Sequence, residues 1–167
     1  MTYGVKAHKF KINKVFYRVI MIKGYSIKPL SQEEKLSFPS EIKLKLESPF
    51  VDARGWIQPL VDVSMESCVL IHSKKGSQRA NHFHRTDWHY CYVLAGEIEY
   101  YSREIGSDSP PQITRISKGE MFFTGPMVEH TMVFLEDTDF LTFGRNSRAQ
   151  EVYEADIVRI PSLVEPS

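Results

Sequence analysis

The chain has 167 residues, of which 42% are hydrophobic, and its 21 basic side chains balance 21 acidic ones. This length supports one domain with a sizeable core and is too short for two comfortable ones. The charge balance excludes a global field that would attract nucleic acid or a membrane surface, and no stretch approaches the ~20 apolar residues of a membrane span. We therefore expect a single domain that binds a small molecule and has no nucleic-acid or membrane partner.

The first forty residues are the least regular part of the chain. Residues 9–12 alternate between lysine and apolar side chains, and residues 15–22 form a mostly apolar run, so both read as strands. No small-residue cleavage signature follows this run, and we predict no signal peptide. We interpret residues 1–40 as an N-terminal extension or dimer arm.

A short helical turn is expected inside this extension. Ser31 is followed three residues later by Glu34, which is the spacing of a capping box. Pro39 then ends the helical pattern.

Short strands separated by turn residues dominate the remainder of the chain. The expected strands lie at residues 42–46, 56–63, 67–72, 89–94, 97–101, 113–116, 121–124, 131–135, 140–144 and 156–160, with a further strand around residues 82–84. Such regular spacing of short strands predicts an all-β sandwich or barrel over residues 41–160, followed by a frayed tail at 161–167.

Four histidines stand at or near the ends of these strands. His82 and His84 are two residues apart, so on a strand both imidazoles project to the same side. A chain reversal after His84 would bring His89 back beside it, and His130 opens a strand from a distant part of the chain. A lone histidine is more often a hydrogen-bonded core or rim residue, but four at adjacent strand ends predict a shared site.

Imidazole is a common protein ligand for divalent transition metals, so this set predicts a metal centre. The metal ligands would be His82, His84, His89 and His130, and the ion would be zinc, iron, manganese or nickel. Open coordination positions would permit catalysis on a bound substrate, whereas a closed tetrahedral zinc would be structural.

The spacing of these residues resembles the two motifs of the cupin family. The first motif is carried by Gly76, His82, His84, His89 and Gly96, and the second by Gly119, Pro126 and His130. His89 stands where the cupin pattern usually has a glutamate, and the Pro-x-Gly of the second motif appears as Gly-Pro-Met. The resemblance implies a double-stranded β-helix, or jelly-roll, barrel with an N-terminal strand extension.

A narrower resemblance is to the cupins that epimerise or isomerise nucleotide sugars. Their Arg-Gly-x-His signature reads here as Arg79-Ala80-Asn81-His82. That resemblance implies chemistry without a metal, in which a histidine and a tyrosine act as base and acid. The candidate catalytic residues are then His82 and His84, with Arg79 as an anion-binding residue and Tyr92 as a candidate for substrate contact.

Alternation along residues 89–94 predicts which side chains face outward from the barrel and need a cover. If His89 faces the interior, then Cys91 and Val93 do so as well, and Tyr90, Tyr92 and Leu94 face outward. An outward face with two tyrosines and a leucine requires a cover, either the N-terminal strand or a second subunit. We therefore predict a homodimer.

These observations predict a metal-binding cupin enzyme that acts on a small, oxygenated, carbohydrate-like substrate. The first alternative is a metal-independent nucleotide-sugar epimerase or ketoisomerase, and the second is a non-enzymatic cupin that binds a ligand or a metal. Two cysteines, Cys68 and Cys91, are too few for a disulfide framework and favour a cytoplasmic protein with reduced thiols.

Overall fold

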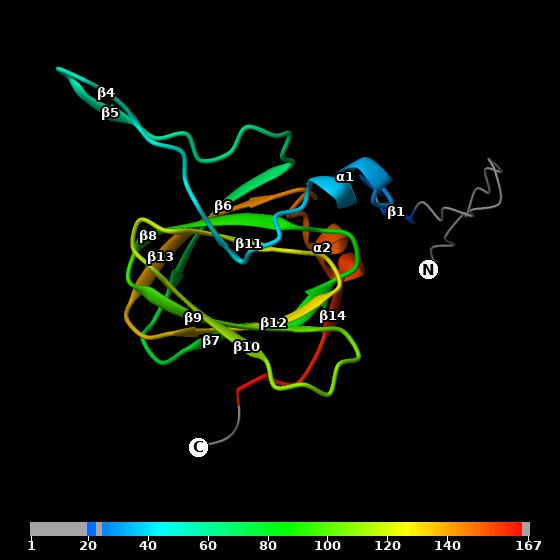
Figure 1. Cartoon of the computed structure of the whole chain (residues 1–167). Helices are drawn as coiled ribbons and strands as arrows, with labels where there is room; N and C mark the ends of the chain where they lie inside the picture. The colour runs from blue at the N-terminus through cyan, green and yellow to red at the C-terminus, as the bar shows by residue number, and fades with distance from the viewer. Residues whose placement is uncertain (1–19, 23–24, 165–167) are drawn as a thin grey trace.

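The computed structural model describes residues 20–22 and 25–164, and the body of this part is built on two facing five-stranded antiparallel sheets (Figure 1). The first sheet contains, in spatial order, β10 (Gln112–Ser117), β9 (Glu97–Glu104), β12 (Val128–Phe134), β7 (Gln78–His84) and β14 (Ile157–Arg159). The second contains β3 (Lys43–Leu44), β11 (Met121–Thr124), β8 (His89–Ala95), β13 (Thr138–Gly144) and β6 (Ser67–Ser73). The predicted all-β class is confirmed.

Inward-facing side chains of both sheets fill the space between them. The core cluster contains Cys91, Val93, Ile98, Tyr100, Ile116, Phe122, Met132, Phe134 and Phe140. Along β8, His89, Cys91 and Val93 are buried and Leu94 is exposed, which confirms the predicted alternation. The histidines therefore continue the same inward row as the apolar core.

A short helix precedes the barrel and is fixed to it by an ion pair. In α1 (Gln32–Ser37), Ser31 and Glu34 form the predicted capping box. The guanidinium of Arg145 then pairs with the Glu34 carboxylate. A two-stranded sheet of β1 (Ile20–Ile22) and β2 (Tyr25–Ile27) comes before this helix, whereas the strand predicted at residues 9–12 lies outside the described residues.

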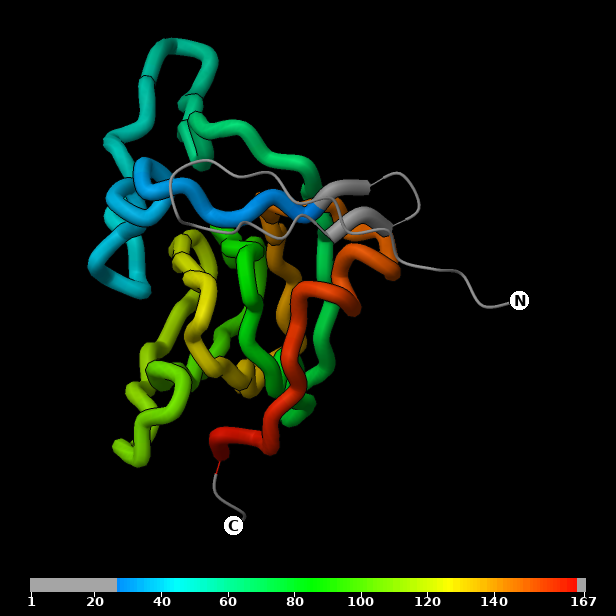
Figure 2. Tube along the Cα trace, turned by 90° about the vertical axis from the view of Figure 1, so that its right-hand side faces the viewer, coloured from blue at the N-terminus to red at the C-terminus, as the bar shows by residue number. Residues whose placement is uncertain are grey.

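The C-terminal segment contains a helix that the sequence analysis did not predict. This helix, α2 (Gln150–Asp156), leads directly into β14, which pairs with β7 beside the histidines. Figure 2 shows the segment, orange to red, passing along one side of the barrel. Neither helix in the described part of the chain is long and apolar enough to cross a membrane.

The strand predicted at residues 56–63 is wrong over most of its length. Only its start forms a strand, β5 (Gly55–Ile57), which pairs with β4 (Phe50–Asp52) as a hairpin. Pro59 follows two residues later, and a proline cannot donate a hydrogen bond to a sheet ladder. Residues 58–66 therefore connect the hairpin to β6 without regular structure.

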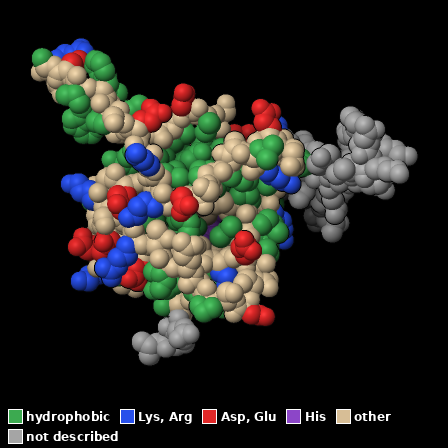
Figure 3. Space-filling view, viewed as in Figure 1, with side chains coloured by type: hydrophobic (Ala, Val, Ile, Leu, Met, Phe, Trp, Pro, Cys, Tyr) green, Lys and Arg blue, Asp and Glu red, His purple; other side chains and the backbone are tan. Residues whose placement is uncertain are grey.

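The β4–β5 hairpin projects from the body of the molecule as an apolar arm (Figures 1 and 3). Its large side chains Phe50, Val51, Trp56 and Ile57 are all 61–69% exposed. An isolated two-stranded hairpin is only marginally stable in water. The arm therefore presents an apolar surface that nothing in the described part of the chain covers.

The outer face of the second sheet is also apolar. Strand register aligns Leu70 of β6 with Leu141 of β13, and Leu141 with Tyr92 of β8. Leu70 at the sheet edge is 63% exposed. This row belongs to the outward face that the sequence predicts to need a cover.

Two glycines of the first sequence motif differ in what surrounds them. Gly76 and Gly96 both have positive φ, of 77° and 85°. A Cβ built on Gly96 would lie 2.6 Å from the backbone oxygen of Asp137 and 2.8 Å from the Cα of Thr138, whereas a Cβ on Gly76 would meet nothing within 4 Å. At position 76 glycine is required only by the positive backbone φ. At position 96 it is required both by the positive φ and by the lack of room for a Cβ atom.

We predict that Gly76→Ala lowers the free energy of unfolding by about 1–2 kcal/mol, the cost of a left-handed alanine. Gly96→Ala is expected to lower it by more than roughly 4 kcal/mol, or to prevent folding, because backbone must also move. Urea denaturation of both variants measures the difference. Equal losses for the two variants would contradict the close approach of residues 137–138 to Gly96.

Candidate functional site

The predicted histidines line a cavity of about 130 Å³ between the two sheets. Its walls are formed by Ile71, Arg79, Ala80, His82, His84, His89, Cys91, His130, Met132, Phe140, Thr142, Arg148 and Tyr153. A larger cavity of about 610 Å³, lined by Phe38, Tyr100 and Phe123 among others, contains no histidine. The smaller cavity is the candidate site because the titratable groups converge there.

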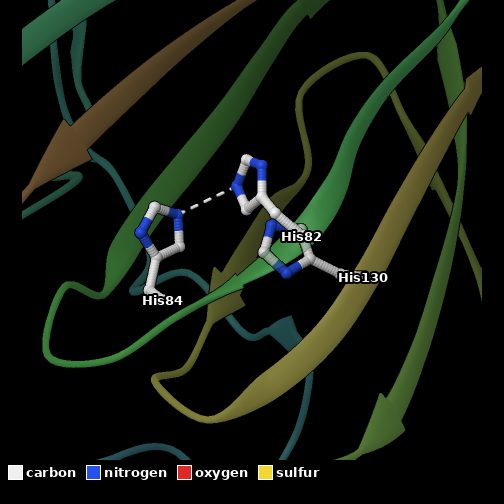
Figure 4. Close-up of side chains that lie close together, drawn as sticks. All are labelled: His82, His84 and His130. Carbon is white, nitrogen blue, oxygen red and sulfur yellow. Dashed lines mark hydrogen bonds between the residues drawn. The ribbon is translucent and has the colours of Figure 1, made fainter. Parts of the chain in front are cut away.

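Three imidazoles lie together at one end of this cavity (Figure 4). His82 and His84 come from β7, and His130 comes from the neighbouring strand β12. The Nε2 atoms of His82 and His84 are 3.2 Å apart, and the ring centroids of His82 and His130 are 4.8 Å apart. One ring nitrogen from each of the three lies within 4.8 Å of the others.

A bulge in β7 sets the direction of these side chains. Opposite β12, His130 pairs with His82 and Thr131 pairs with Ala80, so Asn81 is the extra residue. Ala80 and Asn81 have positive φ of 70° and 52°, an uncommon conformation for residues other than glycine. The Thr131 hydroxyl donates to the Asn81 side-chain oxygen at 2.8 Å and stabilises the bulge.

Acceptors outside the cluster hold the rings in place. The Nδ1 atoms of His84 and His130 lie 3.0 Å from an Asp156 carboxylate oxygen and from the Val128 carbonyl oxygen, respectively. Because a carbonyl and an ionised carboxylate only accept hydrogen bonds, each Nδ1 is assigned the proton. The Nε2 atoms of both rings are then unprotonated, and that of His84 is the acceptor in its 3.2 Å hydrogen bond with the Nε2 of His82.

His89 occupies the same cavity but has a different partner. Its ring centroid lies 4.6 Å from that of His84, and its Nε2 is 2.8 Å from an Asp87 carboxylate oxygen. His89 therefore forms a second group with His84 and Asp87. The structure brings three of the four expected ligands into one group and gives the fourth a carboxylate partner.

A buried polar network connects the two carboxylates. Asp156 accepts from the backbone nitrogen and hydroxyl of Thr86, and Asp87 accepts from the backbone nitrogen of Asn146. The Asn146 side chain donates to the Thr86 hydroxyl at 3.1 Å. His84 and His89 are thus each held by a carboxylate that has further hydrogen bonds of its own.

Burial keeps the clustered imidazoles neutral. It is the main reason that the pKa of His82 falls to about 3, with His84 and His89 nearby adding to the effect. Burial likewise lowers the pKa of His84, against the opposing effect of Asp156, and places the pKa of His130 well below its usual value. At neutral pH, these three rings can accept a proton or bind a cation.

The comparisons with known proteins concern the fold. No family model matches the sequence, and neither does any curated protein. One similar solved structure is a double mutant of the QdtA 3,4-ketoisomerase from Thermoanaerobacterium thermosaccharolyticum in complex with TDP. Its TM-score is 0.55 at 21% sequence identity, and the match covers 71% of this chain and 84% of that chain. The chain has the RmlC-like cupin fold.

Two further cupin-fold structures are similar at comparable levels. The dTDP-4-dehydrorhamnose 3,5-epimerase from Sulfolobus tokodaii has a TM-score of 0.53 at 16% identity, over 73% of this chain and 85% of that one. The capsular polysaccharide assembling protein CapF from Staphylococcus aureus has a TM-score of 0.51 at 20% identity, over 70% of this chain and 34% of that one. The jelly-roll barrel implied by the sequence motifs is confirmed.

Tyr92, which the sequence offers as a candidate for substrate contact, does not line the cavity. Tyr92 alternates with Cys91 and Val93 on β8, so its side chain lies on the outer face of the sheet. The tyrosine beside the imidazoles is Tyr153 of α2, whose ring centroid is 6.0 Å from that of His82. Burial raises the pKa of Tyr153, so its hydroxyl is protonated at neutral pH.

Arg79 and Arg148 both line the cavity but differ in their contacts. Arg79 donates to the Ser73 hydroxyl at 2.7 Å and to the His72 carbonyl oxygen at 2.9 Å, which ties it to the neighbouring edge strand β6. Arg148 lies over the Tyr153 ring, with its Cζ 4.5 Å from the ring centroid. Sequence reasoning missed Tyr153, Arg148 and Asp156, because α2 has only Val152 and Asp156 as buried residues and no side-chain N-cap to mark it.

Proposed function

We propose that this protein is a metal-independent nucleotide-sugar ketoisomerase or epimerase, which moves a proton at a carbon next to a sugar ketone. The observation that carries the proposal is the pairing of His84, which lines the cavity, with Asp156 behind it, at 1% and 2% side-chain exposure. The cupin-fold structures named for a reaction support it, since they are 3,4-ketoisomerases and a 3,5-epimerase. This reading takes precedence over the metal-dependent enzyme that the sequence favoured.

His84 is the proposed general base. Its Nδ1 donates to Asp156 and its Nε2 carries the lone pair, so the Nε2 atom accepts the substrate proton. The positive charge that develops on the ring is stabilised by the Asp156 carboxylate, as in other histidine–aspartate pairs. Hydrogen bonds from His84 and Thr86 outweigh burial and lower the pKa of Asp156, so it is ionised at neutral pH.

Tyr153 is the proposed general acid. It is the tyrosine that lines the cavity, and its ring centroid lies 6.2 Å from that of His84. A protonated phenol beside a neutral imidazole provides the donor and acceptor that enolisation of a ketone requires. Cys91 provides no competing nucleophile, because burial raises the pKa of its thiol to about 12.

This proposal predicts that the protein incorporates solvent deuterium into TDP-4-keto-6-deoxyglucose. His84→Asn is expected to reduce the exchange rate at least 100-fold, and Tyr153→Phe at least tenfold, because general acid–base groups contribute about 10²–10⁴. Tyr92→Phe serves as the matched control and should retain the wild-type rate. Mass spectrometry of the recovered sugar measures the exchange, and its absence with wild-type protein over a panel of TDP-4-keto sugars would rule out the proposal.

A divalent metal ion is the second candidate, and the nitrogen geometry favours it specifically. Two nitrogens that bind one ion at ~2.0–2.1 Å lie roughly 3.0–3.4 Å apart, and the Nε2 atoms of His82 and His84 are 3.2 Å apart. Hydrogen bonds at the Nδ1 atoms of His84 and His130 are the usual support of metal-binding histidines. These residues fit an ion that would polarise a substrate carbonyl when bound.

The second candidate predicts that protein purified without chelator retains about one equivalent of zinc, iron, manganese or nickel, because a preformed three-imidazole site holds its ion. His82→Ala should lose the metal, and His72→Ala, on the exposed outer surface, should keep it. Elemental analysis measures the content. Less than about a tenth of an equivalent in the wild type would exclude the metal site, and deuterium exchange that persists after chelation would assign the chemistry to His84 and Tyr153 alone.

We propose that the apolar arm packs against the second sheet of another copy of the chain. The exposed fractions of its four large side chains leave about 500 Å² of apolar surface, since a large aromatic side chain offers about 150–250 Å². Two arms and the surfaces they cover would bury about 2,000 Å², the area of a stable interface. The chain itself offers both halves of this contact, the arm and the Leu70 row, as a two-fold symmetric dimer requires.

Trp56→Ser combined with Ile57→Ser is expected to convert a dimer into a monomer, because it removes two of the four large apolar side chains of the arm. Light scattering after size exclusion measures the mass. Ile113→Ser, which removes an exposed isoleucine of β10, is the control and should remain dimeric. A wild-type monomer at micromolar concentration would disprove this interface.

Location in the cytoplasm remains a prediction that rests on the free thiols of Cys68 and Cys91.

A further inference from the structure

Arg148 differs from most arginines in the described part of the chain because no carboxylate pairs with it. Five others pair with acidic side chains: Arg54 with Asp52, Arg103 with Glu129, Arg115 with Glu99, Arg145 with Glu34, and Arg159 with Glu154. Arg85 donates to the carbonyl oxygens of Ala155 and Ile157. Arg148 instead lies over an aromatic ring at the wall of the candidate site.

The position of Arg148 relates it directly to the proposed reaction. Its guanidinium carbon is 4.5 Å from the centroid of the Tyr153 ring, and that ring is 6.0 Å from the His82 ring. A guanidinium presents five donors in a planar fork, and an aromatic face satisfies none of them in that plane. One of the Arg148 donors is hydrogen-bonded to the Tyr153 hydroxyl, and the others are available to an acceptor that enters the cavity.

The size of the cavity determines which part of a ligand reaches this position. A cavity of about 130 Å³ is well below the ~300–1,000 Å³ of sites that enclose a drug-sized molecule. It has room for a fragment the size of a sugar ring and none for an attached nucleotide. The remainder of such a ligand must therefore lie outside the cavity, beyond lining residues that are not fully buried, and Arg148 and Tyr153 are among these.

Arg79 is less suited to bind this outer part, although the sequence predicts it as the anion-binding residue. Two of its donors are already used by Ser73 and by the His72 carbonyl oxygen. An anion at Arg79 would have to compete with these hydrogen bonds. Arg148 offers the same positive charge, and its contacts with one residue, Tyr153, are a ring contact and a single side-chain hydrogen bond.

We propose that Arg148 binds the phosphate group attached to the sugar ring of the substrate, while the ring occupies the cavity against His84 and Tyr153. This inference rests on the proposed function and names the part of the substrate that the site recognises. A guanidinium and a phosphate form paired, charge-assisted hydrogen bonds. Arg148 is thus a specificity residue that selects phosphorylated sugars over free ones, and it also positions the Tyr153 ring.

The test compares TDP with thymidine by isothermal titration calorimetry on chelator-treated protein. Wild-type protein should bind TDP at least tenfold more tightly than thymidine. Arg148→Gln should remove most of this preference and leave thymidine affinity within about twofold, because a charge-assisted hydrogen bond contributes on the order of a tenfold change or more. Arg148→Lys should retain part of the preference, since it keeps the charge and loses the fork.

Arg159→Gln is the matched control, because Arg159 pairs with Glu154 on the exposed surface nearby, and it should bind TDP as the wild type does. An Arg148→Gln variant that melts like the wild type and binds TDP within twofold of it overturns the proposal. If wild-type protein binds neither TDP nor thymidine, the same titration with pyrophosphate tests the phosphate contact. If pyrophosphate binds and Arg148→Gln abolishes that binding, this inference stands and the nucleotide part of the proposed function fails. If pyrophosphate does not bind, the inference is overturned.

Discussion

The hydrogen bond between Asp156 and His84 is the interaction on which the site depends. It fixes the His84 ring so that Nε2 turns toward His82, 3.2 Å away. The same residue connects the end of α2 to β7, because the Asp156 carbonyl oxygen accepts from the backbone nitrogen of Arg85. One residue, Asp156, therefore both attaches the C-terminal segment to the barrel and orients the proposed base.

The barrel and the inward histidines could be predicted because both follow from local sequence patterns. Alternation of side chains fixes which residues of β8 are buried, and the spacing of His82 and His84 places them on one face. Gly96 is recognisable for a physical reason, since its positive φ and its contact with residues 137–138 leave no room for a side chain.

The remainder of the site could not be predicted because it arises from tertiary contacts. Tyr153 and Arg148 reach the cavity, and Asp156 reaches His84, only because the segment after β13 folds back along β7. The bulge at Asn81 depends on its pairing with β12. The sequence predicts a strand at residues 56–63, but no strand in the described part of the chain pairs with residues 58–63.

The central claim is that neutral imidazoles held at Nδ1 turn their unprotonated Nε2 atoms toward one point. Long-range proton–nitrogen NMR of metal-free protein with ¹⁵N-labelled histidine tests it most directly, because the two tautomers give distinct nitrogen shifts. We expect His84 and His130 to be neutral at pH 7, with the proton on Nδ1. A proton on Nε2 of His84, or a charged His84 ring at pH 7, would contradict both the proposed base and the proposed metal ligand.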